Sequence, residues 1–103
     1  MTLRALLEAA AADPDDVIAS PTADGGIAWS RGDDVFATLD GDGASAEFRL
    51  DPAIASAAVR TPDTGPSPRG QGWVRFQPAT LDAHGADRAS AWFASAYRRA
   101  SGG

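Results

Sequence analysis

The chain has 103 residues, 44% of them hydrophobic, and a formal net charge of -5. This length suits one hydrophobic core and is too short for two, so we expect a single domain over residues 1–103. The acidic balance repels polyanions at long range, and the absence of cysteine excludes a disulfide framework and a thiolate metal site.

A short helix is predicted at the start of the chain. Leucines recur at three- and four-residue spacings between Thr2 and Ala12, and Asp13-Pro14 opposes further helix. After this point the chain is rich in proline, aspartate, serine and glycine as far as Gly26. A small apolar group at 17–19 interrupts this stretch and fits either an edge strand or a buried loop.

A three-stranded antiparallel meander is predicted next. Residues 27–31 alternate apolar bulk with small or polar side chains, and Gly32-Asp33 supplies a turn to a second β-rich run over 35–39. Residues 40–43 carry another turn signal. Residues 44–50 then alternate again, with Phe48 on one face and Glu47 and Arg49 on the other.

The second half of the chain predicts a short helix and a long loop. Asp51-Pro52 is typical of a helix cap followed by proline at the first helical position, so residues 53–59 are expected to form about two turns. Residues 60–72 hold several prolines and glycines and predict a surface loop without regular structure.

One more strand and a final helix complete the prediction. Residues 73–77 alternate between two faces, and Pro78 closes the strand. Residues 86–100 place Trp92, Phe93 and other apolar side chains at three- and four-residue spacings, which indicates a helix with one core-facing stripe.

Together these elements predict an α+β domain in which an antiparallel sheet of about four strands carries helices on one face. Residues 1–26 form the helix and an irregular lead-in, and residues 27–100 form the core sheet and helices. Residues 101–103 are expected to form a disordered tail.

Residues suited to catalysis do not form a recognisable set. His84 is the only histidine and lies in a turn-like stretch, and the chain has no G-x-S-x-G nucleophile elbow. An enzyme acting on a small molecule would have to use Asp40, Asp51 or His84 as its acid or base. We expect no catalytic residues, no cofactor and a non-enzymatic role, with an enzyme of unrecognised type as an alternative.

The stretch at 40–43 is similar to the opening of an EF-hand loop. The sixth position counted from Asp40 is Ser45, where such a loop requires glycine, and Asp51 stands in place of the bidentate glutamate. We therefore interpret this stretch as a hairpin turn and expect no metal site.

One face of the predicted sheet gathers arginine and tryptophan. If the third and fourth strands are neighbours, Arg49, Trp73 and Arg75 point to the same side together with Gln77. Arginine beside an exposed tryptophan suits partner binding or stacking on bases. The alternative is that the loop at 60–72 covers this face and Trp73 belongs to the core. The candidate binding residues are Arg49, Arg60, Arg69, Trp73, Arg75 and Gln77.

The favoured partner is another protein, bound by Trp73 and the loop at 60–72. Nucleic acid, contacted by the arginines of the candidate set, is an alternative that the acidic net charge disfavours. The chain has no run of 18 apolar residues and no signal-peptide pattern at its start. We therefore expect no membrane partner and a cytoplasmic location.

Four short motifs resemble the MmcQ/YjbR family of small bacterial domains. They are Val35-Phe36-Ala37-Thr38-Leu39, Phe48-Arg49-Leu50-Asp51-Pro52, Gly72-Trp73-Val74-Arg75-Phe76 and Ala96-Tyr97-Arg98-Arg99-Ala100, and the likeness covers roughly Gly26 to the C-terminus. The resemblance implies a compact fold of the CyaY-like kind, and members are often labelled DNA-binding on the basis of a double-wing motif. A second group of small bacterial domains, described as luciferase-like, shows a similar GDG turn and GWV strand.

Overall fold

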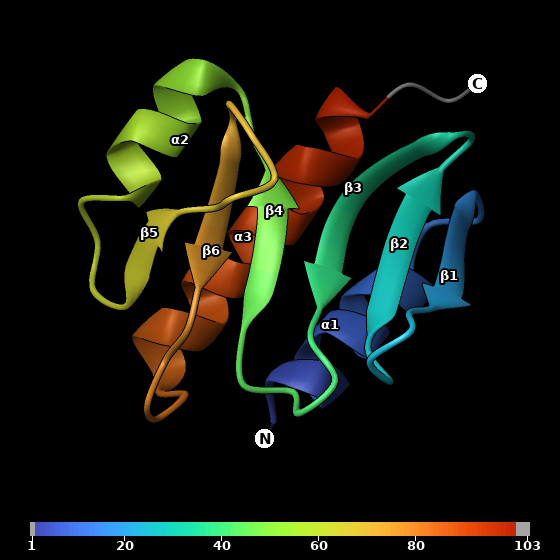
Figure 1. Cartoon of the computed structure of the whole chain (residues 1–103), viewed down its shortest axis with the longest axis horizontal. Helices are drawn as coiled ribbons and strands as arrows, with labels where there is room; N and C mark the ends of the chain where they lie inside the picture. The colour runs from blue at the N-terminus through green and yellow to red at the C-terminus, as the bar shows by residue number, and fades with distance from the viewer. Residues whose placement is uncertain (1, 101–103) are drawn as a thin grey trace.

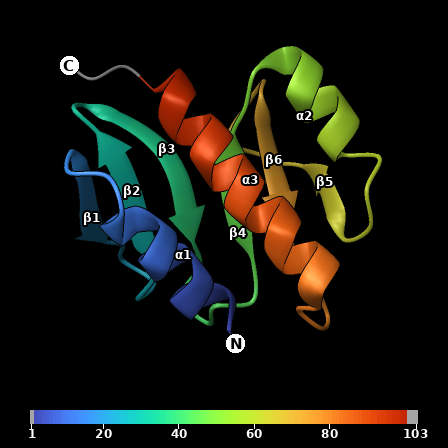
Figure 2. The ribbon, with the colours of Figure 1, turned by 180° about the vertical axis from the view of Figure 1, so that it is seen from behind.

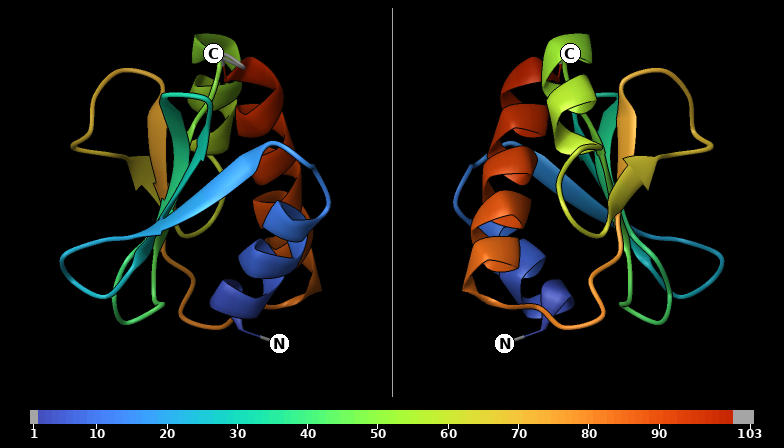
Figure 3. Two further views of the ribbon diagram at one scale, coloured as in Figure 1. Left: turned by 90° about the vertical axis from the view of Figure 1, so that its right-hand side faces the viewer. Right: turned by 90° about the vertical axis from the view of Figure 1, so that its left-hand side faces the viewer.

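The computed structural model describes residues 2–100 as three helices on one face of a six-stranded antiparallel sheet (Figure 1). Figure 2 shows α3 crossing the sheet with α1 beside it, and Figure 3 shows α2 on the same side of the sheet. The predicted tail at 101–103 lies outside the described residues. The elements in chain order are α1 (Leu3–Ala12), β1 (Val17–Pro21), β2 (Ile27–Arg31), β3 (Asp34–Leu39), β4 (Ala46–Arg49), α2 (Pro52–Ala58), β5 (Thr64–Pro66), β6 (Trp73–Phe76) and α3 (Ala83–Arg99).

The predicted meander is confirmed, and the sheet extends beyond it on both sides. Strands β2, β3 and β4 pair as consecutive antiparallel neighbours, and the full order is β1-β2-β3-β4-β6-β5. The third and fourth predicted strands, β4 and β6, are indeed adjacent. A register shift between Trp29 and Ser30 lets β3 accommodate one extra residue opposite β2.

The sheet has six strands, whereas about four are predicted, and the two strands that the prediction lacks lie at its edges. The apolar group left open as strand or buried loop forms β1, which pairs with β2 along one edge. Strand β5 lies within the stretch predicted to lack regular structure, and it pairs with β6 at the opposite edge. Its three residues include Gly65 and Pro66, so they carry no alternation of apolar and polar side chains that would indicate a strand.

Helix α3 begins at Ala83, earlier than predicted. The carboxylate of Asp82 accepts a hydrogen bond from the amide of Gly85 at 2.7 Å and caps the helix. The stretch that resembles a turn is therefore an N-cap with the first helical turn. Gly85 is buried, and a methyl group in its place would sit 3.4 Å from the ring of Phe76.

The core lies between the sheet and the two longer helices. Phe93 of α3 meets Trp29 and Phe36 edge to face, with ring centroids 5.5 and 5.2 Å apart, and Trp92 meets Phe76 in the same way. The apolar stripe of α3 thus packs into the core, as predicted. Helix α1 contributes two leucines to the same cluster, and Thr2 caps its start, because the Thr2 hydroxyl accepts a hydrogen bond from the amide of Ala5.

The second face of the sheet, here called the open face, carries none of the described helices. Figure 3 shows that loops between strands project on this side, away from α1 and α3. Within residues 2–100, no helix combines the length and the apolar character that a membrane-spanning segment requires.

Candidate functional site: a polar pocket on the open face

A polar cavity of about 530 Å³ lies on the open face, between the β1–β2 loop, the β3–β4 loop and the segment that joins β5 to β6. We call it the open-face pocket. Its lining residues are Thr22, Ala23, Asp24, Thr38, Leu39, Asp40, Ser45, Glu47, Arg69 and Arg75.

Three neighbouring strands supply the floor of this pocket. Thr38 of β3 lies opposite Glu47 of β4, and Glu47 lies opposite Arg75 of β6. Because successive residues of a strand point to opposite faces, Ala46 and Phe48 enter the core while Glu47 faces the pocket. The floor is therefore a row of polar side chains across the middle of the sheet.

Glu47 connects this floor to the segment between β5 and β6. Its carboxylate accepts hydrogen bonds from Nε of Arg69 at 2.8 Å, from the hydroxyl of Ser67 and, weakly at 3.5 Å, from the hydroxyl of Thr38. Ser67 is itself buried, and its amide donates to the carbonyl of Trp73. The segment that the sequence indicates as a plain surface loop is thus tied to the sheet through one carboxylate.

Asp24 holds the two other loops against each other. Its carboxylate accepts from the hydroxyl of Thr22 and from the amides of Gly26 at 3.0 Å and Gly41 at 3.2 Å. The hydrogen bond from Thr22 lowers the pKa of Asp24 most, and the two amides lower it further. The contact is so close that a methyl group at Gly41 would lie 1.9 Å from the carbonyl oxygen of Asp24.

Asp40 organises the β3–β4 turn. Its carboxylate accepts from the amide of Ala44 at 3.0 Å and from both the amide and the hydroxyl of Ser45, at 3.1 and 2.5 Å. Burial alone raises the pKa of this carboxyl, but the hydrogen bonds from Ser45 and Ala44 outweigh it and leave the pKa below its ordinary value. The interpretation of this stretch as a hairpin turn agrees with these contacts.

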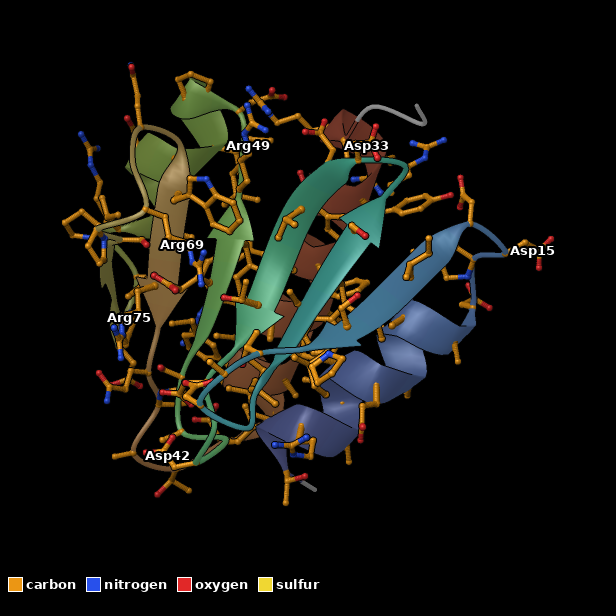
Figure 4. The ribbon with its side chains drawn as sticks, turned by 45° about the vertical axis from the view of Figure 1, so that its right-hand side comes forward. Asp15, Asp33, Asp42, Arg49, Arg69 and Arg75 are labelled. Carbon is orange, nitrogen blue, oxygen red and sulfur yellow. The ribbon has the colours of Figure 1, made fainter. Side chains whose placement is uncertain are left out.

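Arg75 and Arg69 reach the pocket from its other side. Arg75 donates to the hydroxyl of Ser45 at 3.1 Å and lies 3.8 Å from the carboxylate of Asp40. Its Nε is buried and has no hydrogen-bond partner among the described residues. Arg69 lies over the indole of Trp73, with its guanidinium carbon 5.4 Å from the ring centroid. Figure 4 shows both arginines between the loop of Asp42 and the far end of β4.

The six predicted site residues therefore separate into groups. Arg69 and Arg75 line the pocket, and Trp73 stacks beneath Arg69 at its rim. Trp73 is half-buried, so it is neither a fully buried core residue nor a fully exposed one, which are the two predicted alternatives.

The other three predicted residues lie away from the cavity. Arg49 is on the same face but outside the lining, where it pairs with Asp34 at 3.3 Å. Arg60 follows α2, Gln77 follows β6, and both are exposed and absent from the lining.

Sequence reasoning misses Glu47, Ser67 and Asp24 as site residues. Glu47 carries a signal, because its position in an alternating strand places an acid on the face that also holds the predicted arginines. Ser67 and Asp24 carry none, since each lies in a loop and reaches the site only through the pairing of distant strands.

The three residues predicted as possible acids or bases, Asp40, Asp51 and His84, do not lie together in one site. Asp40 lies at the start of the β3–β4 turn, whereas Asp51 follows the other end of β4 and contacts Arg99 at 3.1 Å. His84 is exposed in the first turn of α3. Across residues 2–100, no group of three or more His, Cys, Asp or Glu side chains is placed to hold a metal ion.

Comparison with known proteins gives no relative from which a function can be transferred: no family model, curated protein or solved structure matches the chain.

Proposed function

We propose that this chain is a non-enzymatic binding domain of the MmcQ/YjbR type that binds a protein partner on the open face of its sheet. The observation that carries the proposal is the open-face pocket with the Arg69–Trp73 stack at its rim. The motifs that resemble the family fall on β3, on β4 with the start of α2, on β6 and at the end of α3, in the family's order. This order supports the family assignment and the CyaY-like fold that it implies.

The charge pattern of the open face favours a protein over a nucleic acid. Each arginine on this face pairs with a carboxylate: Arg49 with Asp34, Arg69 with Glu47, and Arg75 with Asp40 at the longer distance of 3.8 Å. Affinity for nucleic acid comes largely from cations that neutralise phosphates, and paired arginines do this poorly. The net charge of -5 acts in the same direction.

Exposed apolar side chains extend the face beyond the pocket. Ile18 of β1 and Val35 of β3 lie in one row across β2, each opposite Ser30, and their exposed fractions are 57% and 38%. Protein interfaces combine such apolar contacts with aromatic and arginine side chains at the positions that contribute most affinity. The mixed character of the open face therefore suits a folded or extended polypeptide.

Nucleic-acid binding is retained as a second candidate because Arg49, Arg69, Trp73 and Arg75 do share one face. A tryptophan stacked with arginine is also a platform on which a base can stack. Titration of the labelled protein with a short DNA duplex at low salt tests this candidate, since binding through phosphates weakens steeply as salt rises.

Selection from a displayed library of random peptides tests the proposed function. The wild-type protein is immobilised, and enriched peptides are measured against Trp73→Ala, Arg75→Ala and Arg98→Ala. Arg98 lies on α3, on the far side of the sheet, and serves as the control. We expect peptides whose affinity falls at least about tenfold for the two open-face variants, a loss of about 1.4 kcal/mol, and is unchanged for the control.

Two outcomes would contradict the proposal. Enriched peptides that bind all variants equally would place the binding surface elsewhere. A library that yields no binder, together with a DNA titration that shifts open-face signals, would replace the protein partner with a nucleic acid.

A further inference from the structure

The acids of the open-face pocket already have their hydrogen-bond donors. Asp24, Asp40 and Glu47 each accept three hydrogen bonds from side chains or amides of the protein. These bonds hold the three surrounding loops in place. The three carboxylates therefore have a structural role, in which they fix the positions of the loops that line the pocket.

Each arginine of the same pocket pairs with one carboxylate but keeps N–H donors that this pair does not use. A guanidinium has five N–H donors. Among residues 2–100, the side chain of Arg75 donates one hydrogen bond, to Ser45, and that of Arg69 donates one, to Glu47. Both side chains line the pocket and are 40% and 44% exposed, so part of each guanidinium side chain is accessible although Nε of Arg75 is buried. The hydrogen-bonding capacity that remains in the pocket is thus mainly that of donors.

From this imbalance we propose that the open-face pocket binds a carboxylate group of the partner, held by the guanidinium groups of Arg75 and Arg69. The inference rests on the proposed function and adds the chemistry that the pocket recognises. Guanidinium and carboxylate match in planar geometry and form charge-assisted hydrogen bonds, which are stronger than those between neutral groups. Trp73 beneath Arg69 limits the freedom of that side chain before the ligand arrives.

A carboxylate fits this pocket better than a phosphate or a cation. The pocket holds three carboxylates and two guanidiniums, so a phosphate near -2 adds twice the charge of a carboxylate to a site that is already negative. A cation would need acceptors, and the acids are engaged with the loops.

The test follows the Nε–H signals of Arg69 and Arg75 by NMR during titration with four short glycine-serine peptides. The first has blocked ends and one internal glutamate, and the second has glutamine in its place. The third has phosphoserine in place of the glutamate. The fourth has glutamine and a free C-terminal carboxylate. We expect the glutamate peptide to shift both signals and the glutamine peptide to leave them unchanged.

Matched variants separate geometry from charge. Arg75→Lys keeps the positive charge and loses the planar pair of donors, so the glutamate peptide should bind at least about fivefold more weakly. Arg98→Lys makes the same exchange on α3 and should leave binding unchanged. The thermal unfolding of each variant shows whether it is folded.

The two peptides with a carboxylate distinguish its source. Shifts with the internal glutamate alone indicate an acidic side chain, and shifts with the free end alone indicate a chain terminus. Either result supports the proposal.

Equal and measurable shifts with the glutamate and glutamine peptides, no shift with either carboxylate peptide, tighter binding of the phosphoserine peptide, or unchanged binding by Arg75→Lys would overturn it. The library selection is scored separately, so binders that lack a required carboxylate would refute this inference and leave the proposed function intact.

Discussion

Arg31 lies over the ring of Tyr97, with its guanidinium carbon 4.5 Å from the ring centroid, and donates to the carbonyl of the same residue at 3.2 Å. It also donates to the carbonyl of Ala100 and to the carboxylate of Asp16, at 3.3 and 3.0 Å. The last carbonyls of a helix lack partners within the helix and favour a nearby cation. A strand residue thus caps the C-terminus of α3 and joins it to the start of β1.

Replacing this cap should destabilise the domain. We expect Arg31→Ala to lower the free energy of unfolding by about 1–2 kcal/mol, because two carbonyls lose a charged donor. Arg98→Ala, which removes an exposed cation from the same turn, should cost only a few tenths of a kcal/mol. Urea unfolding followed by tryptophan fluorescence measures both, and equal midpoints for the two variants would refute the capping role.

The contact between the two loops beside the pocket should not tolerate a side chain at Gly41. A methyl group there would lie 1.9 Å from the carbonyl oxygen of Asp24, so the loops would have to separate. We expect Gly41→Ala to destabilise the protein by about 1–3 kcal/mol. The control is Gly65→Ala, where a methyl group meets nothing within 4 Å, and its effect should stay within about 0.5 kcal/mol. Similar thermal midpoints for both variants would contradict this prediction.

Stability should fall in acid partly through Asp40. The pKa of this carboxyl is lowered in the folded protein, so near pH 4 the unfolded chain binds more protons than the folded one. The stabilising contribution is therefore complete above the ordinary aspartate pKa and is lost as pH falls through the lowered value. Unfolding curves from pH 6 to pH 2 should show a shallower decline for Asp40→Asn, and parallel declines would argue against it.

Two tryptophans should respond differently to truncation. Trp29 is 1% exposed and contacts Phe93, so Trp29→Ala should cost about 3–5 kcal/mol. Trp73 is half-buried on the open face, and Trp73→Ala should cost about 1–2 kcal/mol and leave a cooperative transition. Thermal unfolding by circular dichroism compares them. An unfolded Trp73→Ala protein would mean that Trp73 belongs to the core.

Local patterns predict much of the fold. The alternation along β4 correctly places Phe48 inside and Glu47 and Arg49 on the opposite face. The apolar spacing of α3 identifies its core side, because a helix of this length presents one continuous stripe. Strand β5 escapes prediction, since Thr64–Pro66 becomes a strand only through the edge that β6 offers.

The candidate site is predictable only in part. The prediction that Arg49 of β4 shares a face with Trp73 and Arg75 of β6 follows from strand geometry, because successive residues of a strand point to opposite faces. The pairing of each arginine with a specific acid depends on the relative positions of the three loops around the pocket, and no local sequence pattern predicts those positions. Gln77 belongs to the predicted set because alternation along residues 73–77 places it on the face of Arg75, and Arg60 because it is an arginine of the predicted loop at 60–72, yet neither lines the pocket.

The position of β6 has a consequence for the newly made polypeptide. β6 is the last strand among the described residues, but it lies inside the sheet, paired with β4 on one side and with β5 on the other. While the ribosome extends the chain, the strands from β1 to β4 can form hairpins between neighbours, but β4 keeps an unpaired edge until residues 73–76 emerge. Helix α3, which covers the apolar side of those strands, is synthesised later still. We therefore expect the strands from β1 to β4 to depend on β6 and α3, so that the domain completes its fold only after residues 73–99 have been synthesised.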